Sequence, residues 1–190
     1  MWRATRVSAD FFNNVQKEAG ILLKTFDVSN PVEPNDDDII TATTGGISVT
    51  CVPETQDLFE DIDNVPNGTK EGLDITRWNV GLSTTAIGID EETIVFSLGA
   101  AEVNVNGGVS PRRNYKLDDF KTITWIGDMT DPKKLLCAII KNAVSTGGFS
   151  LQTGKNAKGQ LALEIAGHTS LENQEEVPAE FYILEKVGEE

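Results

Sequence analysis

Apolar and polar positions alternate most regularly over residues 75–82, ITRWNVGL. Most apolar side chains of this stretch fall at every second position, with polar or small residues between them. A period of two is typical of a strand that buries one face and leaves the other to solvent or to a partner. The pattern therefore predicts a central strand with Trp78, Val80 and Leu82 in the core.

The period changes at Asp90. This aspartate suits a helix N-cap, and the two glutamates after it suit the positive end of a helix. Ile94 and Leu98 then fall at helical spacing, which predicts an α-helix over about residues 90–101 that packs these two side chains onto the sheet. Because residues 93–98 are short and rich in β-formers, a second buried strand is the alternative.

The rest of the chain predicts short strands separated by turns. Residues 39–43 and 47–52 are expected to form a hairpin around Gly45 and Gly46. The further expected elements are a short helix within residues 8–19 and strands at 21–26, 122–126, 135–144, 149–152, 160–166 and 180–184. In the strand at 160–166, the alternation of Leu161, Leu163 and Ile165 places these three side chains in the core.

Many short strands with frequent turns and one helix predict a mainly β fold, a β-sandwich or barrel with a flanking α-helix. The length of 190 residues suits one domain with a complete hydrophobic core. We therefore expect a single domain over residues 1–190.

Residues 53–72, PETQDLFEDIDNVPNGTKEG, lack a clear period. Loops of this length are uncommon in compact domains unless they have a function or pair as an extended hairpin. Apolar residues at the tip of a long arm indicate a contact with another molecule. We expect Leu58, Phe59, Asp61 and Ile62 at a subunit interface, and the alternative is a loop that folds back on its own core.

Composition narrows the classes of partner. The chain has 16 Lys and Arg against 30 Asp and Glu, a net charge of −14, which disfavours binding to nucleic acid or anionic lipid. Its longest wholly apolar run, residues 135–140, is far below the roughly 20 residues of a membrane span, and the start of the chain lacks a signal-peptide core. Cys51 and Cys137 lie in strand-like runs, which favours free thiols over a disulfide.

Candidate chemistry is sparse. His168 is the only histidine, so a site with two histidine ligands within one chain is excluded, and no G-x-S-x-G motif accompanies it. Asp61 and Asp63 resemble the opening of a calcium loop, but Val65 and Pro66 occupy later positions that need a ligand and a glycine. The sequence predicts no enzyme, no metal and no cofactor.

Seven stretches, in this order along the chain, resemble one family, the major tail tube proteins of long-tailed, siphovirus-type bacteriophages. They are VQKEAGILL (15–23), TGGISV (44–49), EDIDNVPN (60–67), LGAAEV (98–103), DDF (118–120), KNAVSTGGFSLQT (141–153) and VPAEFY (177–182). Each stretch alone is weakly specific, and the order of all seven carries the resemblance.

The resemblance implies a structural virion protein that is made in the cytoplasm of a bacterial host. Six subunits would form a ring, and stacked rings would form the tail tube through which DNA leaves the capsid, with other tail proteins at the tube ends. Because the chain ends soon after Leu184, we expect no C-terminal immunoglobulin-like domain. We also expect a bore lined mainly by carboxylates, through which DNA passes without tight binding.

A carbohydrate-binding β-sandwich module is the alternative from another class. Such a module needs a surface tryptophan on which a sugar ring stacks. Trp78 and Trp125 both lie in alternating strands, which places them in the core instead.

Overall fold

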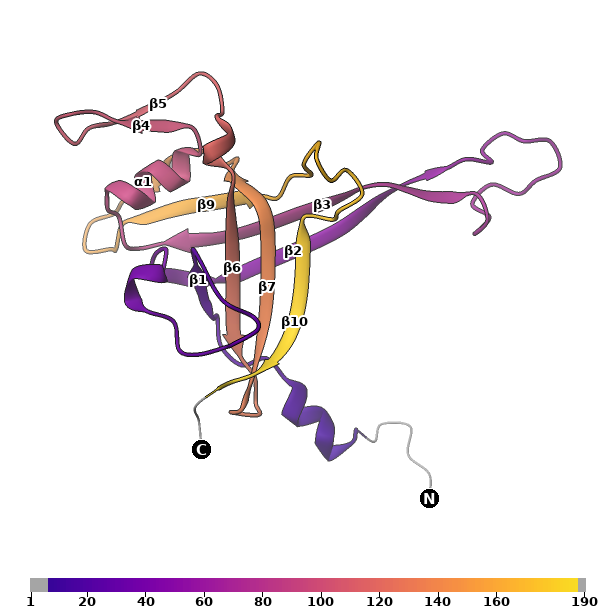
Figure 1. Cartoon of the computed structure of the whole chain (residues 1–190), viewed down its shortest axis with the longest axis horizontal. Coiled ribbons are helices and arrows are strands. Elements are labelled where there is room, and N and C mark those ends of the chain that lie inside the picture. The colour runs from indigo at the N-terminus through magenta and orange to yellow at the C-terminus, as the bar shows by residue number, and fades with distance from the viewer. Residues whose placement is uncertain (1–6, 188–190) are drawn as a thin grey trace.

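The computed structural model describes residues 7–187 (Figure 1). The expected domain of residues 1–190 therefore includes residues 1–6 and 188–190, which lie outside the described part. The strands are β1 (Ile21–Leu23), β2 (Thr43–Asp57), β3 (Leu73–Ala86), β4 (Ala101–Val103), β5 (Val109–Pro111), β6 (Lys121–Asp128), β7 (Lys134–Ser145), β8 (Ser150–Gln152), β9 (Gln160–Ala166) and β10 (Ala179–Glu185). The helices are α1 (Glu91–Leu98) and three short 3-10 helices, η1 (Ala9–Asn14), η2 (Asp36–Asp38) and η3 (Leu117–Asp119). The mainly β fold with one α-helix is thus confirmed.

Eight strands form one antiparallel sheet in the order β1-β6-β7-β9-β3-β2, with β10 added beside β7 and β8 beside β9. Strands β4 and β5 form a separate hairpin. Strand β7 joins two halves of the sheet, because it pairs with β6 and β10 along most of its length and with β9 only at Val144 and Ser145. Figure 1 shows β6, β7 and β10 running across the direction of β2, β3 and β9. The folded sheet is therefore an orthogonal sandwich.

The main core lies between the two halves. It joins Leu22 of β1, Val80 and Leu82 of β3, Ile123 of β6 and Ile165 of β9, together with residues of β7. Of the side chains expected in the core, five are buried, namely Val80, Leu82, Leu161, Leu163 and Ile165. Trp78 is half-buried against the same cluster.

A second core covers the outer face of β6 and β7. Leu135 and Cys137 pack there with Leu23 and Ile126, under Phe26 and other residues of the connection from β1 to β2. Strands buried on both faces do not alternate between apolar and polar residues. This explains the continuous apolar run at residues 135–140.

Helix α1 begins where the sequence predicts it. The Asp90 side chain accepts a hydrogen bond from the Thr93 backbone N–H at 2.7 Å, so it is the N-cap, and the alternative of a second strand is wrong. The buried face differs from the expected one, because Thr93 and Ser97 are fully buried while Ile94 and Leu98 are only half-buried.

The reason for this difference is the closeness of α1 to β7. The Ser145 hydroxyl donates a hydrogen bond to the Ser97 carbonyl oxygen at 2.7 Å. Small side chains on the inner face of α1 allow the two backbones to approach this closely, and the helix thus seats against the junction between the sheet halves.

The expected hairpin around Gly45 and Gly46 is wrong. Strand β2 runs straight through both glycines, with a register shift against β3 between Thr44 and Ile47. Their φ angles of +79° and +89° belong to the left-handed region, which serves a β-bulge as well as a tight turn. Of the strand expected at 39–43, Ile39 makes a single bridge with Leu23 and Thr43 begins β2, while residues 40–42 between them belong to no strand.

Candidate self-assembly surface

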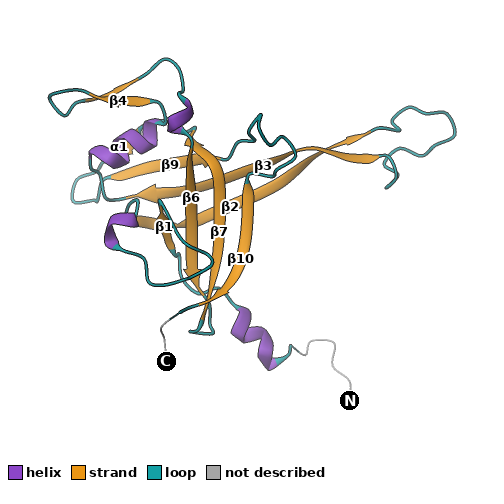
Figure 2. Cartoon of the chain, viewed as in Figure 1, coloured by secondary structure: helices purple, strands orange, loops and turns teal. Residues whose placement is uncertain are grey.

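The most prominent surface feature is a hairpin arm formed by the outer parts of β2 and β3 with the loop between them (Figure 2). Strand β9 supports β3 only over residues 81–86, so residues 73–80 of β3 pair with β2 alone. We define the arm as residues 53–77 and its tip as residues 58–72. The stretch predicted as a long loop or hairpin arm is therefore partly strand, and it projects from the sandwich.

Contacts within the arm fix its shape. The Asp57 carboxylate accepts hydrogen bonds from the backbone N–H groups of Phe59 at 2.9 Å and Gly68 at 2.6 Å. Across the hairpin, Arg77 Nε lies 2.5 Å from Glu54 Oε2, and this hydrogen bond lowers the pKa of the Glu54 carboxyl. Because exposed ion pairs contribute little to stability, the backbone ladder and the Asp57 contacts are the main restraints.

The four residues expected at an interface do not share one environment. Leu58 and Ile62 are exposed, at 56% and 47%, and Asp61 is exposed in a left-handed conformation, with φ of 63°. Phe59 is half-buried over Gly72, where an added Cβ would lie 2.8 Å from the Phe59 ring. Phe59 therefore folds back as the alternative expected, but onto the arm itself, while Leu58 and Ile62 remain free for a partner.

Two further exposed apolar residues lie on the strand part of the arm. Leu73 and Ile75 are both exposed and lie on the same side of β3. The arm thus carries apolar side chains from its tip toward its base, a pattern more typical of an interface than of an isolated surface.

The sheet also presents a free apolar edge at β10, which pairs with β7 and with no other strand among residues 7–187. Phe181 and Ile183 on this strand are 54% and 61% exposed. An unprotected edge with exposed apolar residues favours pairing with another chain. The sequence pattern predicts this strand but does not indicate that its apolar side chains are exposed.

A third apolar group lies on η1, near the N-terminal end of the described chain. Phe11 and Phe12 are both more than half exposed, and their rings meet edge to face at 6.0 Å. Figure 2 shows η1 standing away from the sandwich.

Within residues 7–187 no group of three or more His, Cys, Asp or Glu side chains is arranged to hold a metal ion. His168 is exposed and meets the Phe120 ring edge to face at 5.4 Å. Cys51 and Cys137 are free thiols, and burial raises the pKa of both.

Neither tryptophan of the described chain forms a platform for a sugar. Trp78 packs against the main core, and Trp125 is 8% exposed, with its Nε1–H donating to the Ala19 carbonyl oxygen at 2.8 Å. The carbohydrate-binding alternative therefore lacks the feature it needs at these two positions. No helix within residues 7–187 is long and apolar enough to cross a membrane.

Comparison with known proteins finds similarity in structure but none to a family model or a curated protein. No protein-family model and no curated protein matches the chain. Among solved structures, the chain is similar to one from "Virion of native gene transfer agent (GTA) particle", at 11% sequence identity and a TM-score of 0.43, with 86% of this chain and 95% of that chain covered. Similarity at this level assigns no function.

Proposed function

We propose that this protein is a structural component of a phage-like virion and that it self-assembles head to tail into rings that stack into a tail tube. The observation that carries the proposal is the arm, a fixed hairpin that ends in exposed Leu58 and Ile62. An exposed apolar side chain at the end of a projecting arm contributes little to the stability of its own subunit. It contributes free energy only when another molecule covers it.

The resemblance to tail tube proteins supports the same proposal, because its stretches fall at the junctions of the fold. TGGISV contains the bulge of β2, LGAAEV joins the end of α1 to β4, and KNAVSTGGFSLQT covers the end of β7 and all of β8. VPAEFY leads into the free edge at β10. Six subunits per ring, rings that stack and other tail proteins at the tube ends are the finer part of the proposal and derive from the resemblance.

The proposal predicts reversible self-association that increases with salt. Each subunit carries a net charge of −14, so copies repel one another until added ions screen the charges over about 10 Å or less. Sedimentation velocity across protein concentration and ionic strength should show large species at high values of both, and electron microscopy should show rings or tubes. A protein that stays monomeric under all of these conditions, with or without a tail-tip nucleus, would contradict the proposal.

A tube that conducts DNA must not hold it, so assembled tubes are expected to retain no duplex DNA even at low ionic strength. Each lysine that contacts a phosphate adds salt-dependent affinity through counterion release, and a ring multiplies that affinity by its number of subunits. The excess of carboxylates disfavours such contacts. A filter-retention assay, with a basic DNA-binding protein as positive control, measures this directly, and tight retention of DNA by tubes would contradict a role as a conduit.

A further inference from the structure

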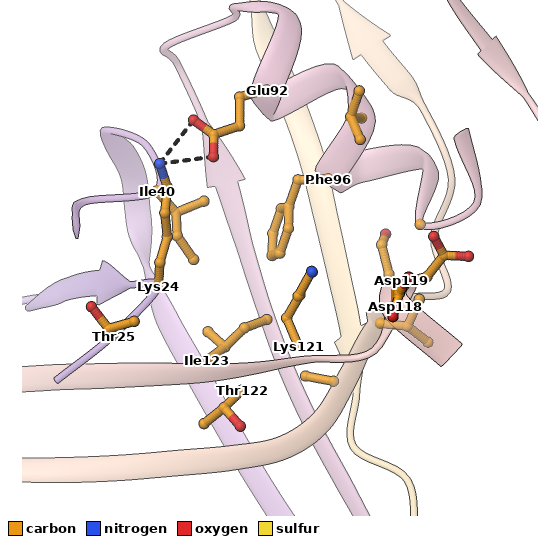
Figure 3. Close-up of a pocket in the computed structure, with 15 residues that line it drawn as sticks. Lys24, Thr25, Ile40, Glu92, Phe96, Asp118, Asp119, Lys121, Thr122 and Ile123 are labelled. Carbon is orange, nitrogen blue, oxygen red and sulfur yellow. Dashed lines mark hydrogen bonds and ion pairs between the residues drawn. The ribbon is translucent and has the colours of Figure 1, made fainter. Parts of the chain in front are cut away.

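A pocket of about 580 Å³ lies between α1 and the sheet, next to strands β6 and β7. Apolar side chains line much of it, including Ile40, Val95, Phe96, Ile123 and Val144. Figure 3 shows Phe96 projecting from α1 toward Ile123 of β6, with Ile40 beside Lys24. The pocket can therefore receive aliphatic side chains from outside the subunit.

Lys121 is the cation of interest at this pocket. Lys24 closes one end by an ion pair with Glu92 at 2.8 Å, and Asp119 is bound by the Arg112 guanidinium. Lys121 lines the pocket, and its ammonium group makes no ion pair or hydrogen bond within residues 7–187. Asp118 on the rim has no ion pair within residues 7–187 either, so the lining as a whole is not basic. What it offers to a partner is the Lys121 ammonium group beside apolar walls.

The arm tip has the complementary composition. Exposed Leu58 and Ile62 are surrounded by Glu60, Asp61 and Asp63, all of them exposed. Another exposed apolar segment, η1, carries only Asp10 beside its two phenylalanines. Charge therefore favours the arm tip over η1 as the group that meets Lys121.

Position excludes contact between an arm and its own pocket. The tip and α1 lie at opposite ends of the longest axis of the molecule (Figure 1). A donor at one end and an acceptor at the other define a head-to-tail contact, which closes into rings or propagates as a stack.

We infer that the pocket between α1 and β6–β7 binds the arm tip of a second copy of this chain, with Leu58 and Ile62 inside and the acidic residues of the tip facing Lys121. This inference rests on the proposed function and adds the acceptor site to it. It makes each subunit both a donor and an acceptor through two surfaces that do not overlap.

Charge reversal at Lys121 tests the inference. Lys121→Glu should raise the protein concentration needed for half-maximal assembly by about tenfold or more, because like charges across an interface are strongly unfavourable. Lys133→Glu is the matched control, since it makes the same change in net charge at the exposed turn between β6 and β7. Glu60→Lys, Asp61→Lys and Asp63→Lys should each be tested in the Lys121→Glu background, and at least one should recover most of the lost assembly.

The outcomes separate the inference from the proposed function. Wild-type protein that never assembles overturns both. Assembly of wild-type protein with equal effects of Lys121→Glu and Lys133→Glu overturns the inference alone, as does a Lys121→Glu defect that none of the three reversals reduces. In that case assembly depends on another contact, such as η1 or the β10 edge.

Crosslinking provides a second measurement that does not depend on charge. Protein with Ile62→Cys is mixed with protein carrying Thr122→Cys, which lies at the pocket, and treated with a short bis-maleimide. A covalent dimer of one chain of each kind is expected in assembled samples. Reactions with either variant alone give the background from Cys51 and Cys137, and a mixed sample at background level overturns the inference.

Discussion

Replacement of Leu58 and Ile62 by serine is expected to abolish assembly while the isolated subunit stays as stable as the wild type. Both side chains are exposed on the arm tip, so their removal creates no cavity in the core. Substitutions at exposed positions change the free energy of unfolding by about 0.5 kcal/mol or less. Every subunit contact made through the tip would lose both apolar groups, and sedimentation and thermal melting of the same samples measure the two effects.

Phe59→Ser provides the contrast. The sequence pattern groups Phe59 with Leu58, but the structure places its ring over Gly72. Its loss should therefore loosen the tip and weaken assembly indirectly. Val105→Ser, which removes a fully exposed valine from the β4–β5 hairpin, controls for a general loss of surface hydrophobicity. If the Leu58 and Ile62 variant unfolds, or if it assembles like the Val105 variant, the arm tip is not the contact.

The sequence predicts strands well where one face of the strand is exposed to solvent, because apolar and polar residues then alternate with a period of two. The prediction at residues 160–166 matches β9 at both ends. Helix α1 begins at its predicted N-cap because capping is a local interaction between Asp90 and Thr93. Local chemistry and regular alternation are therefore the parts of this fold that can be read from sequence alone.

The sequence-based predictions are wrong where contacts between residues far apart in the sequence determine the local structure. Two adjacent glycines allow a bulge or a turn equally, and only the pairing of β2 with β3 selects the bulge. The prediction for the inner face of α1 is wrong. The pattern places apolar residues against the sheet, whereas the small side chains of Thr93 and Ser97 are the ones that fit the close approach to β7. Thr44 pairs with Thr85, and Ser97 meets Ser145, so both contacts join residues that lie far apart in the sequence.

The candidate self-assembly surface is likewise predictable from the sequence only in part. The arm is visible in the sequence because a long charged stretch with apolar residues is unusual for a loop. The β10 edge is not visible, since Phe181 and Ile183 alternate as core residues do and pair with Ala138 and Leu136, which lie on the inner face of β7. Alternation shows which residues share a face, but it cannot show where the covering layer ends.

Because α1 packs closely against β7, we expect Gly99→Ala to lower the stability of the subunit strongly. Gly99 ends the helix with φ of +70°, and a Cβ there would lie 2.6 Å from the Ser145 carbonyl oxygen. A left-handed conformation costs an L-residue about 1–2 kcal/mol, and forced overpacking typically costs a further 1–3 kcal/mol. We therefore expect the free energy of unfolding to fall by about 2–5 kcal/mol, as measured by urea denaturation.

Gly148→Ala separates the two causes. Gly148 has a similar φ of +67°, but no atom lies within 4 Å of a Cβ built there, so only the conformational cost of about 1–2 kcal/mol applies. The excess loss in Gly99→Ala then measures the close approach of α1 to β7. Because Gly99, Val95 and Phe96 all line the pocket, a displaced α1 should also impair assembly, whereas Gly148→Ala should assemble normally. Equal destabilisation by the two substitutions would mean that α1 moves away from β7 at no cost in free energy. Normal assembly of a destabilised Gly99→Ala protein would mean that α1 takes no part in the contact between subunits.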